Sequence, residues 1–236
     1  MSEDKIKTGI IGLDERLGGG LPKGSIVLIV SDSETCLRMF SQQVPFNMAS
    51  MGLKVIYFSI VKEPQFVREE MDLYKWDTVP LEEKGAWVFV DAYTPKIDTL
   101  LLHSVVTPDS TPLALIRSEI LSKLKKGEVV VIDSLSDLLV TQKPDSVIEL
   151  LEIISAKIMK IGGLALIPVL KNMHDKKTIA TISHLADVVL EFIVGEARFE
   201  GRLVFWKMRR VRLEPLFLPF SITDRGIVAE TFRRVI

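Results

Sequence analysis

The chain has 236 residues, of which 47% are hydrophobic and 26% are charged, a composition that suits one α/β domain spanning residues 1–236. Its net charge of −1 argues against a general nucleic-acid binder, and its single cysteine, Cys36, excludes an internal disulfide and suits a reducing compartment. The charged first residues are followed by no signal-peptide core, and no apolar run approaches the ~18 residues of a membrane span. We therefore expect a cytoplasmic protein without a membrane partner.

The first buried strand is predicted at residues 26–30, after a short helix at about residues 13–17 that ends at three consecutive glycines. The strand residues are all apolar and mostly β-branched, as in a parallel strand that is covered on both faces. A helix is predicted from about Thr35 to about Ala49. A strand, a tight turn and a helix form the context in which a phosphate-binding loop normally occurs.

The chemistry of this turn is wrong for phosphate. A phosphate-binding loop reads G-x-x-x-x-G-K-[ST], with glycines that let backbone N–H groups close around the phosphates and a lysine that reaches them. In that register the chain has Ser31, Asp32, Ser33, Glu34, Thr35, Cys36, Leu37 and Arg38. Serine and cysteine replace the glycines, leucine replaces the lysine, and arginine replaces the Mg²⁺-binding hydroxyl. Each contact of a carboxylate with phosphate at 4 Å would cost about 4 kcal/mol at an effective dielectric constant near 20.

The same residues make a good helix start. Ser31 and Glu34 have the spacing of a capping box, and Asp32 or Ser33 is an alternative N-cap. Two interpretations stay open: an ordinary capped helix, or a vestigial nucleotide loop whose N–H groups are now satisfied by the chain's own side chains.

Strands and helices alternate along the rest of the chain. Strands are predicted at residues 54–60, 86–92, 128–136 and 164–170, and helices from Pro64 to about Tyr74, from residues 109–112 to near Gly127, and from Pro144 to Gly162. Three consecutive strands are predicted at residues 188–194, 202–208 and 217–222. The pattern predicts an α/β fold with a mostly parallel central sheet, helices on both faces and a C-terminal antiparallel extension.

Several blocks, in the same order along the whole chain, resemble the KaiC-like branch of the RecA/RadA ATPase superfamily, and most of all its small single-domain archaeal members. The blocks are TGI at residues 8–10, GLD at 12–14, GGGLP at 18–22, GS at 24–25, VIDSL at 131–135, HLADVV at 184–189, WKMR at 206–209 and FSITDRGI at 220–227. The resemblance implies a RecA-like P-loop NTPase core with the strand order 5-1-4-3-2. It also implies a ring or filament with ATP bound between neighbouring subunits.

The resemblance also assigns roles to single positions. Active members carry two acids at the end of the second strand, where this chain has Val61, Lys62 and Glu63; we expect Glu63 to be a surface residue in a salt bridge. Asp133 matches the Walker B acid, which orients Mg²⁺ through water. A structural role for Asp133 is favoured, because Ser134 and Asp137 have capping-box spacing. With three components of the hydrolytic set replaced, we do not expect ATP hydrolysis or any catalytic residue.

Lys207 and Arg209 lie two positions apart in a predicted strand, so both side chains should project from one face. In the family the matching pair reaches the γ-phosphate bound to the neighbouring subunit. The sharper hypothesis is that this chain supplies the pair to an active paralogue. The alternative is a solvated edge strand, which Arg210 and Arg212 favour.

The remaining candidates are weak. Residues 171–181 occupy the place where RecA-like proteins carry a central loop. They carry basic side chains but no interleaved aromatic residue for base stacking, so we expect a mobile, solvated loop. His103, His174 and His184 lie far apart in the sequence, and no cluster has the spacing of metal ligands.

Three functions therefore stay open. The leading hypothesis is a catalytically inactive KaiC-like subunit, a pseudo-ATPase without cofactor that acts as a structural or regulatory interaction protein in a homo-oligomer, or in a hetero-oligomer with an active KaiC-like paralogue. The first alternative is a non-hydrolysing switch that binds ATP or ADP with Mg²⁺, which Asp133 favours and Asp32, Glu34 and Leu37 oppose. The second alternative is a small-molecule or nucleic-acid binder at the crevice where the parallel strands end.

Overall fold

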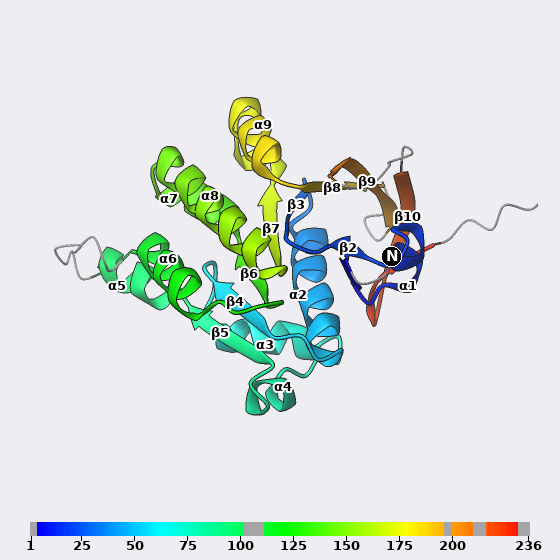
Figure 1. Cartoon of the computed structure of the whole chain (residues 1–236), viewed down its shortest axis with the longest axis horizontal. Coiled ribbons are helices and arrows are strands. Elements are labelled where there is room, and N and C mark those ends of the chain that lie inside the picture. The colour runs from blue at the N-terminus through cyan, green and yellow to red at the C-terminus, as the bar shows by residue number, and fades with distance from the viewer. Residues whose placement is uncertain (1–3, 102–110, 196–199, 210–215, 231–236) are drawn as a thin grey trace, which may run out of the picture.

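The computed structural model of the chain describes residues 4–101, 111–195, 200–209 and 216–230. A nine-stranded sheet runs through this part of the molecule in the order β11-β10-β9-β8-β3-β7-β6-β4-β5 (Figure 1). Its strands are β3 (Ser25–Ser31), β4 (Val55–Ser59), β5 (Trp87–Asp91), β6 (Val129–Asp133), β7 (Leu164–Leu170), β8 (Val188–Val194), β9 (Glu200–Met208), β10 (Leu216–Thr223) and β11 (Gly226–Ala229). The pairs from β8 through β3 to β5 are parallel, and those from β8 to β11 are antiparallel. The predicted fold class is confirmed.

The order of the central strands differs in one respect from the implied order. Numbered along the chain, the six predicted central strands lie in the order 6-1-5-4-2-3. The order 5-1-4-3-2 holds only for β8-β3-β7-β6-β4, when β5 is set aside. The reason is that β5 is an added strand at the sheet edge, where it pairs with β4 alone and is only partly buried.

Helices cover both faces of the sheet. They are α1 (Ile11–Arg16), α2 (Glu34–Ser50), α3 (Pro64–Asp72), α4 (Val79–Glu83), α5 (Thr94–Leu101), α6 (Pro112–Lys123), α7 (Leu135–Thr141), α8 (Pro144–Ile161) and α9 (Lys176–Leu185). Figure 1 shows α6, α7, α8 and α9 on one side, with α2 and α3 on the other.

Strand β3 explains why the sequence around it is continuously apolar. Val27 and Ile29 pack into the core that contains α2, whereas Leu28 and Val30 pack into the core that contains α8. Every residue of β3 is buried, because parallel strands carry helices on both faces.

The N-terminal segment forms a small ribbon of β1 (Lys5–Ile6) and β2 (Leu21–Pro22) around α1. The glycine run ends α1, as predicted. Gly20 has a φ of +123°, and a Cβ atom at this position would lie 2.2 Å from the carbonyl oxygen of Ile6. Only glycine therefore fits where the chain enters β2.

Other boundaries depart from the prediction. Helix α6 begins after the N-cap Thr111 and ends at Lys123, before Gly127, because Leu124 is extended; Asp109 and Ser110 lie outside the described residues. The strand predicted at residues 128–136 ends at Asp133, because α7 begins at Leu135. Helices α4, α5 and α9 and strands β1, β2 and β11 were not predicted. In the described residues, no helix combines the length and the apolar character needed to cross a membrane.

The prediction of a mobile loop at residues 171–181 is wrong. A 3₁₀ turn, η2 (Lys171–Met173), is followed by the start of α9. The Asp175 carboxylate accepts a hydrogen bond from the Thr178 N–H over 2.9 Å, which caps α9 and fixes its first turn.

Candidate functional site

The turn between β3 and α2 contains only Asp32 and Ser33. The Ser31 hydroxyl accepts a hydrogen bond from the Ser33 N–H over 3.0 Å and donates one to the Phe192 carbonyl over 3.2 Å. The Ser33 hydroxyl accepts from the Cys36 N–H over 3.4 Å, and the Leu37 N–H bonds to the Ser33 carbonyl over 3.2 Å. The capping box of Ser31 with Glu34 is wrong, since Ser31 is the last residue of β3. The alternative N-cap, Ser33, is confirmed.

The side chains of the predicted vestigial loop are divided between core and solvent. Cys36 and Leu37, in the first turn of α2, are buried in the core, whereas Asp32, Glu34 and Thr35 are exposed. Burial raises the pKa of the Cys36 thiol, although the contact with Ser33 opposes this shift. Because Leu37 stands where a phosphate-binding lysine would be, the position presents an apolar group.

A cavity of about 210 Å³ lies where β4, β6 and β7 end. Its apolar wall includes Leu37, Val67 and Leu170. Its polar lining includes Arg38 and Lys62, both half-buried. Ligands of open α/β sheets typically bind at this edge, and clefts or cavities with mostly apolar walls and a few polar groups typically hold small molecules.

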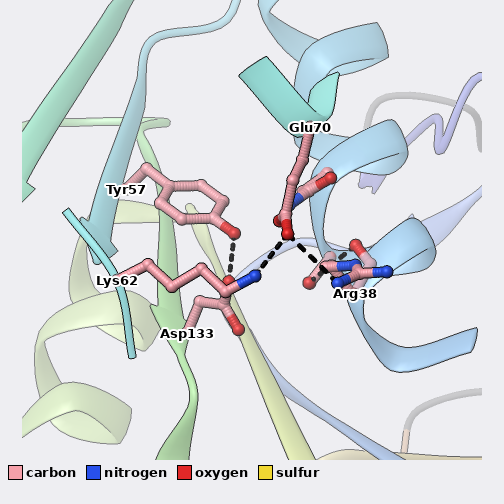
Figure 2. Close-up of polar contacts among 7 residues, drawn as sticks. Arg38, Tyr57, Lys62, Glu70 and Asp133 are labelled. Carbon is pink, nitrogen blue, oxygen red and sulfur yellow. Dashed lines mark hydrogen bonds and ion pairs between the residues drawn. The ribbon is translucent and has the colours of Figure 1, made fainter. Parts of the chain in front are cut away.

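Asp133 lines the cavity and is partly buried. The hydroxyl of the buried Tyr57 donates a hydrogen bond to its carboxylate (Figure 2). The pKa of Asp133 is raised to about 6, mainly by burial and also by the nearby charge of Glu70, whereas Tyr57, Arg38 and Lys62 act in the opposite direction. The same burial, together with the Asp133 charge, raises the pKa of Tyr57.

The predicted capping role of the residues after Asp133 is wrong. The Ser134 side chain makes no capping bond to α7, and the Asp137 carboxylate instead forms a 2.9 Å ion pair with Lys96. Lys96 lies on α5, so a cation distant in sequence binds the Asp137 carboxylate, which the spacing had assigned to the start of α7. Asp133 is instead the hydrogen-bond partner of the buried Tyr57.

A second cluster lies in the wall of the same cavity and centres on Glu70 of α3. One carboxylate oxygen of Glu70 accepts from the Arg38 guanidinium over 3.1 Å and from the Lys62 ammonium (Figure 2). The other oxygen accepts from the Gln42 amide over 3.5 Å. Glu63 is exposed and has no ion pair within the described residues, so its predicted salt bridge is wrong. The neighbouring Lys62 forms an ion pair, with Glu70.

Sequence reasoning missed Tyr57, Glu70 and Gln42. Arg38 and Gln42 are four positions apart and share one face of α2, which is the only local signal for this cluster. Glu70 lies 32 positions after Arg38, and Tyr57 lies 76 positions before Asp133. The order of the strands, rather than spacing along the chain, brings these groups together.

Lys207 and Arg209 project from one face, as predicted. The Lys207 ammonium donates to the carbonyls of Ser183 over 3.0 Å and His184 over 2.8 Å, and Arg209 reaches the His184 carbonyl and the Asp187 carboxylate, each over 3.4 Å. Both cations therefore lie at the C-terminal end of α9. Burial lowers the pKa of Lys207, and the charge of Arg209 lowers it further.

The alternative of a solvated edge strand is wrong for β9, because β8 and β10 flank it. Arg210 and Arg212, which favoured that alternative, lie outside the described residues. The pair is thus engaged within the chain.

The remaining candidates lie apart. Lys171 pairs with Glu191 over 2.7 Å, and Glu191 also accepts from the Trp206 indole over 2.6 Å. A ring nitrogen of His174 contacts the Ser136 hydroxyl at 2.9 Å, and His103 lies outside the described residues. Across the described ranges, no group of three or more histidine, cysteine or acidic side chains is arranged to hold a metal.

Comparisons with known proteins agree with this architecture. Residues 6–231 match the family model described as "ATPase: KaiC". The chain is 29% identical over 230 residues to a UPF0273 protein of Thermotoga maritima (95% of each chain) and 29% identical over 234 residues to one of Pyrococcus horikoshii (95% of this chain, 93% of that protein). The crystal structure of a KaiC-like protein from Pyrococcus horikoshii has a TM-score of 0.70 at 20% identity, covering 96% of this chain and 99% of that one. That last likeness bears on the fold alone.

Proposed function

The chain belongs to the KaiC ATPase family, and from that premise we propose that it is a member that neither binds nor hydrolyses ATP and acts as a structural or regulatory interaction subunit. The observation that carries this proposal is the closed turn between β3 and α2. There, the Cys36 and Leu37 N–H groups already bond to Ser33. Backbone N–H groups at this turn are what a phosphate-binding loop offers to nucleotide.

The charges around the turn support the same conclusion. Leu37 is buried, and the exposed carboxylates of Asp32 and Glu34 flank the helix start where phosphates would lie. The nearby cations, Arg38 and Lys62, are both bonded to Glu70. Phosphoryl transfer depends on a phosphate cradle, a cation and a positioned metal. The residues present do not fit Mg²⁺-ATP.

Two measurements test the proposal. Isothermal titration with ATP and ADP, each with and without Mg²⁺, should give no heat of binding, and a phosphate-release assay should give no turnover. A catalytically competent family member, prepared in the same way, is the positive control. Binding without turnover would favour the nucleotide-binding switch, and turnover that a Cys36 or Leu37 substitution abolishes would end the proposal.

Assembly with other subunits is part of the proposal. Trp206 and Phe217 are 65% and 54% exposed on the neighbouring strands β9 and β10, on the sheet face beyond α9. We expect a homo-oligomer, or a hetero-oligomer with an active paralogue, that dissociates in Trp206→Ser and Phe217→Ser variants. Sedimentation velocity of each variant and of the unmodified chain is the measurement. A monomer in every sample would contradict this expectation.

In a mixed oligomer, Lys207 and Arg209 would act on the neighbour's nucleotide only by leaving the carbonyls at the end of α9. The exposure of the Arg209 side chain, 51%, favours this possibility. The test mixes the chain with a competent relative and compares turnover with Arg209→Ala and unmodified chains. Equal rates would dispose of this role.

The cavity favours a second candidate function, the binding of a small molecule. It combines an apolar wall with the acid Asp133, whose pKa burial raises to about 6. A library of small molecules screened by thermal shift, against the unmodified protein and Leu170→Trp, tests this candidate. Stabilisers should lose their effect when the larger side chain fills the cavity.

A further inference from the structure

We propose that Arg38, Gln42 and Lys62 form an oxyanion position beside the cavity, and that the Glu70 carboxylate fills this position as an intramolecular ligand. The inference rests on the proposed function, since the cations near the turn are engaged by the chain itself. It goes further by assigning a binding position, the chemical class of its ligand and the group that occupies it.

The donors converge on one carboxylate from two separate elements. Arg38 and Gln42 come from α2, whereas Lys62 comes from the segment between β4 and α3. The Ser59 hydroxyl, at the end of β4, bonds to the Lys62 carbonyl and holds that segment in place. Gln42 is 2% exposed, so its amide is fixed by packing. Two cations and a buried amide donor, all directed at one carboxylate, are the contacts that a small oxyanion requires.

The charge balance of the cluster depends on Glu70. Arg38 and Lys62 bond to the same carboxylate oxygen, so their positive charges lie close together, and the Glu70 charge offsets their repulsion. Removal of that charge would leave two cations next to a cavity of about 210 Å³. A tetrahedral oxyanion such as sulfate or phosphate would then restore the balance. In the unmodified chain, the tethered carboxylate keeps such anions out.

The test measures sulfate binding to Glu70→Gln. This substitution keeps the shape of the side chain and removes its charge. We expect sulfate to bind the variant at least about tenfold more tightly than the unmodified chain. The readouts are isothermal titration with sodium sulfate and the rise in melting temperature in sulfate relative to chloride at equal ionic strength.

Two matched variants separate a specific position from a general gain in positive charge. Glu69→Gln removes the same charge from the same helix, but Glu69 contacts Gln65 and not the cluster. Its sulfate affinity should equal that of the unmodified chain. The double variant Glu70→Gln/Lys62→Met should lose the gain, because one of the two cations is gone.

The outcomes are distinguishable. Sulfate binding by Glu70→Gln that is no tighter than by Glu69→Gln overturns the inference and leaves the proposed function standing. ATP binding by the unmodified chain refutes the proposed function by itself. If Glu70→Gln does not fold in either salt, Glu70→Asp keeps the net charge but shortens the reach of the carboxylate. Sulfate must then raise the melting temperature of Glu70→Asp more than that of the unmodified chain, and equal rises overturn the inference.

Discussion

Two regions at the same edge of the sheet are closed in opposite ways. The turn after β3 is held by neutral groups: the hydroxyls of Ser31 and Ser33, the N–H groups that follow them, and the Phe192 carbonyl. The ends of β4 and β6 are held by ionisable groups far apart in sequence, above all Tyr57 with Asp133 and Glu70 with its two cations. We therefore expect the stability of the turn to change only when its own side chains are changed. The stability of the second region should also depend on pH and salt.

The largest expected effect is the pH dependence due to Asp133. Its pKa is about 6 in the folded protein and 3.8 in a model compound, so between these values the folded state binds more protons than the unfolded chain. The contribution of this group to the free energy of unfolding should therefore be highest below pH 4 and fall, as pH rises through 6, by up to about 3 kcal/mol. Asp133→Asn should lack this decrease. Urea unfolding of both proteins at several pH values between 4 and 8 gives the difference.

The difference between the two proteins matters more than either curve. Glu82 and Asp175, whose pKa values are lowered by hydrogen bonds, lose stabilisation as pH falls. They contribute equally to both proteins and therefore cancel. Parallel curves for the unmodified chain and Asp133→Asn would show that the two regions do not differ in pH response.

The second-largest effect is expected at Tyr57, whose hydroxyl donates the hydrogen bond to Asp133. Tyr57→Phe removes the hydroxyl that lowers the pKa of Asp133, so the fall in stability should move to higher pH. At pH 8, where the acid is ionised, the substitution should destabilise the fold by about 2 kcal/mol, a typical value for a hydrogen bond to a charged group. Tyr74→Phe is the control, since its hydroxyl has no hydrogen-bond partner within the described ranges and its ring stacks on Trp76. Equal losses in both variants would contradict a special role for Tyr57.

The two regions also differ in how far sequence alone predicts them. The strands Leu164–Leu170 and Val188–Val194 were predicted to the residue, because each is a continuous apolar run. Around the turn, Ser33 was one of three possible caps. The choice was settled by Ser31, whose hydroxyl bonds to Phe192 at a distance of 161 positions in the chain. Local spacing therefore predicts the possible caps, and the contact of Ser31 with the distant strand β8 decides which of them forms.

The ionic cluster was beyond sequence reasoning for the same reason. The sequence assigned Asp137 to a helix start and Glu63 to a surface ion pair. Asp137 instead pairs with Lys96, and the ion pair beside Glu63 is formed by Lys62 with Glu70. Charged side chains are long and find partners across elements, so the order of strands in the sheet decides which of them meet. The prediction for residues 171–181 was wrong for a different reason. The resemblance implied a loop at this place, although Asp175 and Thr178 have the spacing of a helix cap.

The turn itself should give a moderate, pH-independent effect. Ser33→Ala removes the N-cap of α2 and should lower the free energy of unfolding by about 1 kcal/mol. Ser33→Asn keeps an oxygen acceptor and should restore all but a few tenths of that loss. Urea unfolding at pH 5 and pH 8, in low and high salt, is the measurement. A loss that varied with pH would erase the contrast between the two regions.

The smallest effect tests whether charge at the far side of the sheet behaves like the cluster or like the turn. Lys207 donates to two carbonyls at the C-terminal end of α9, where a cation typically contributes about 0.3–1 kcal/mol. Burial and the charge of Arg209 lower the pKa of Lys207, which means that the ammonium is partly disfavoured there. We therefore expect Lys207→Met to cost about 0.5 kcal/mol at low salt and less at high salt. Arg202→Met is the matched control on the same strand, since Arg202 is exposed and has no ion pair in the described part of the chain. If salt does not change the loss of unfolding free energy in Lys207→Met, the Lys207 contact behaves like the neutral turn after β3, because salt screens only the charge.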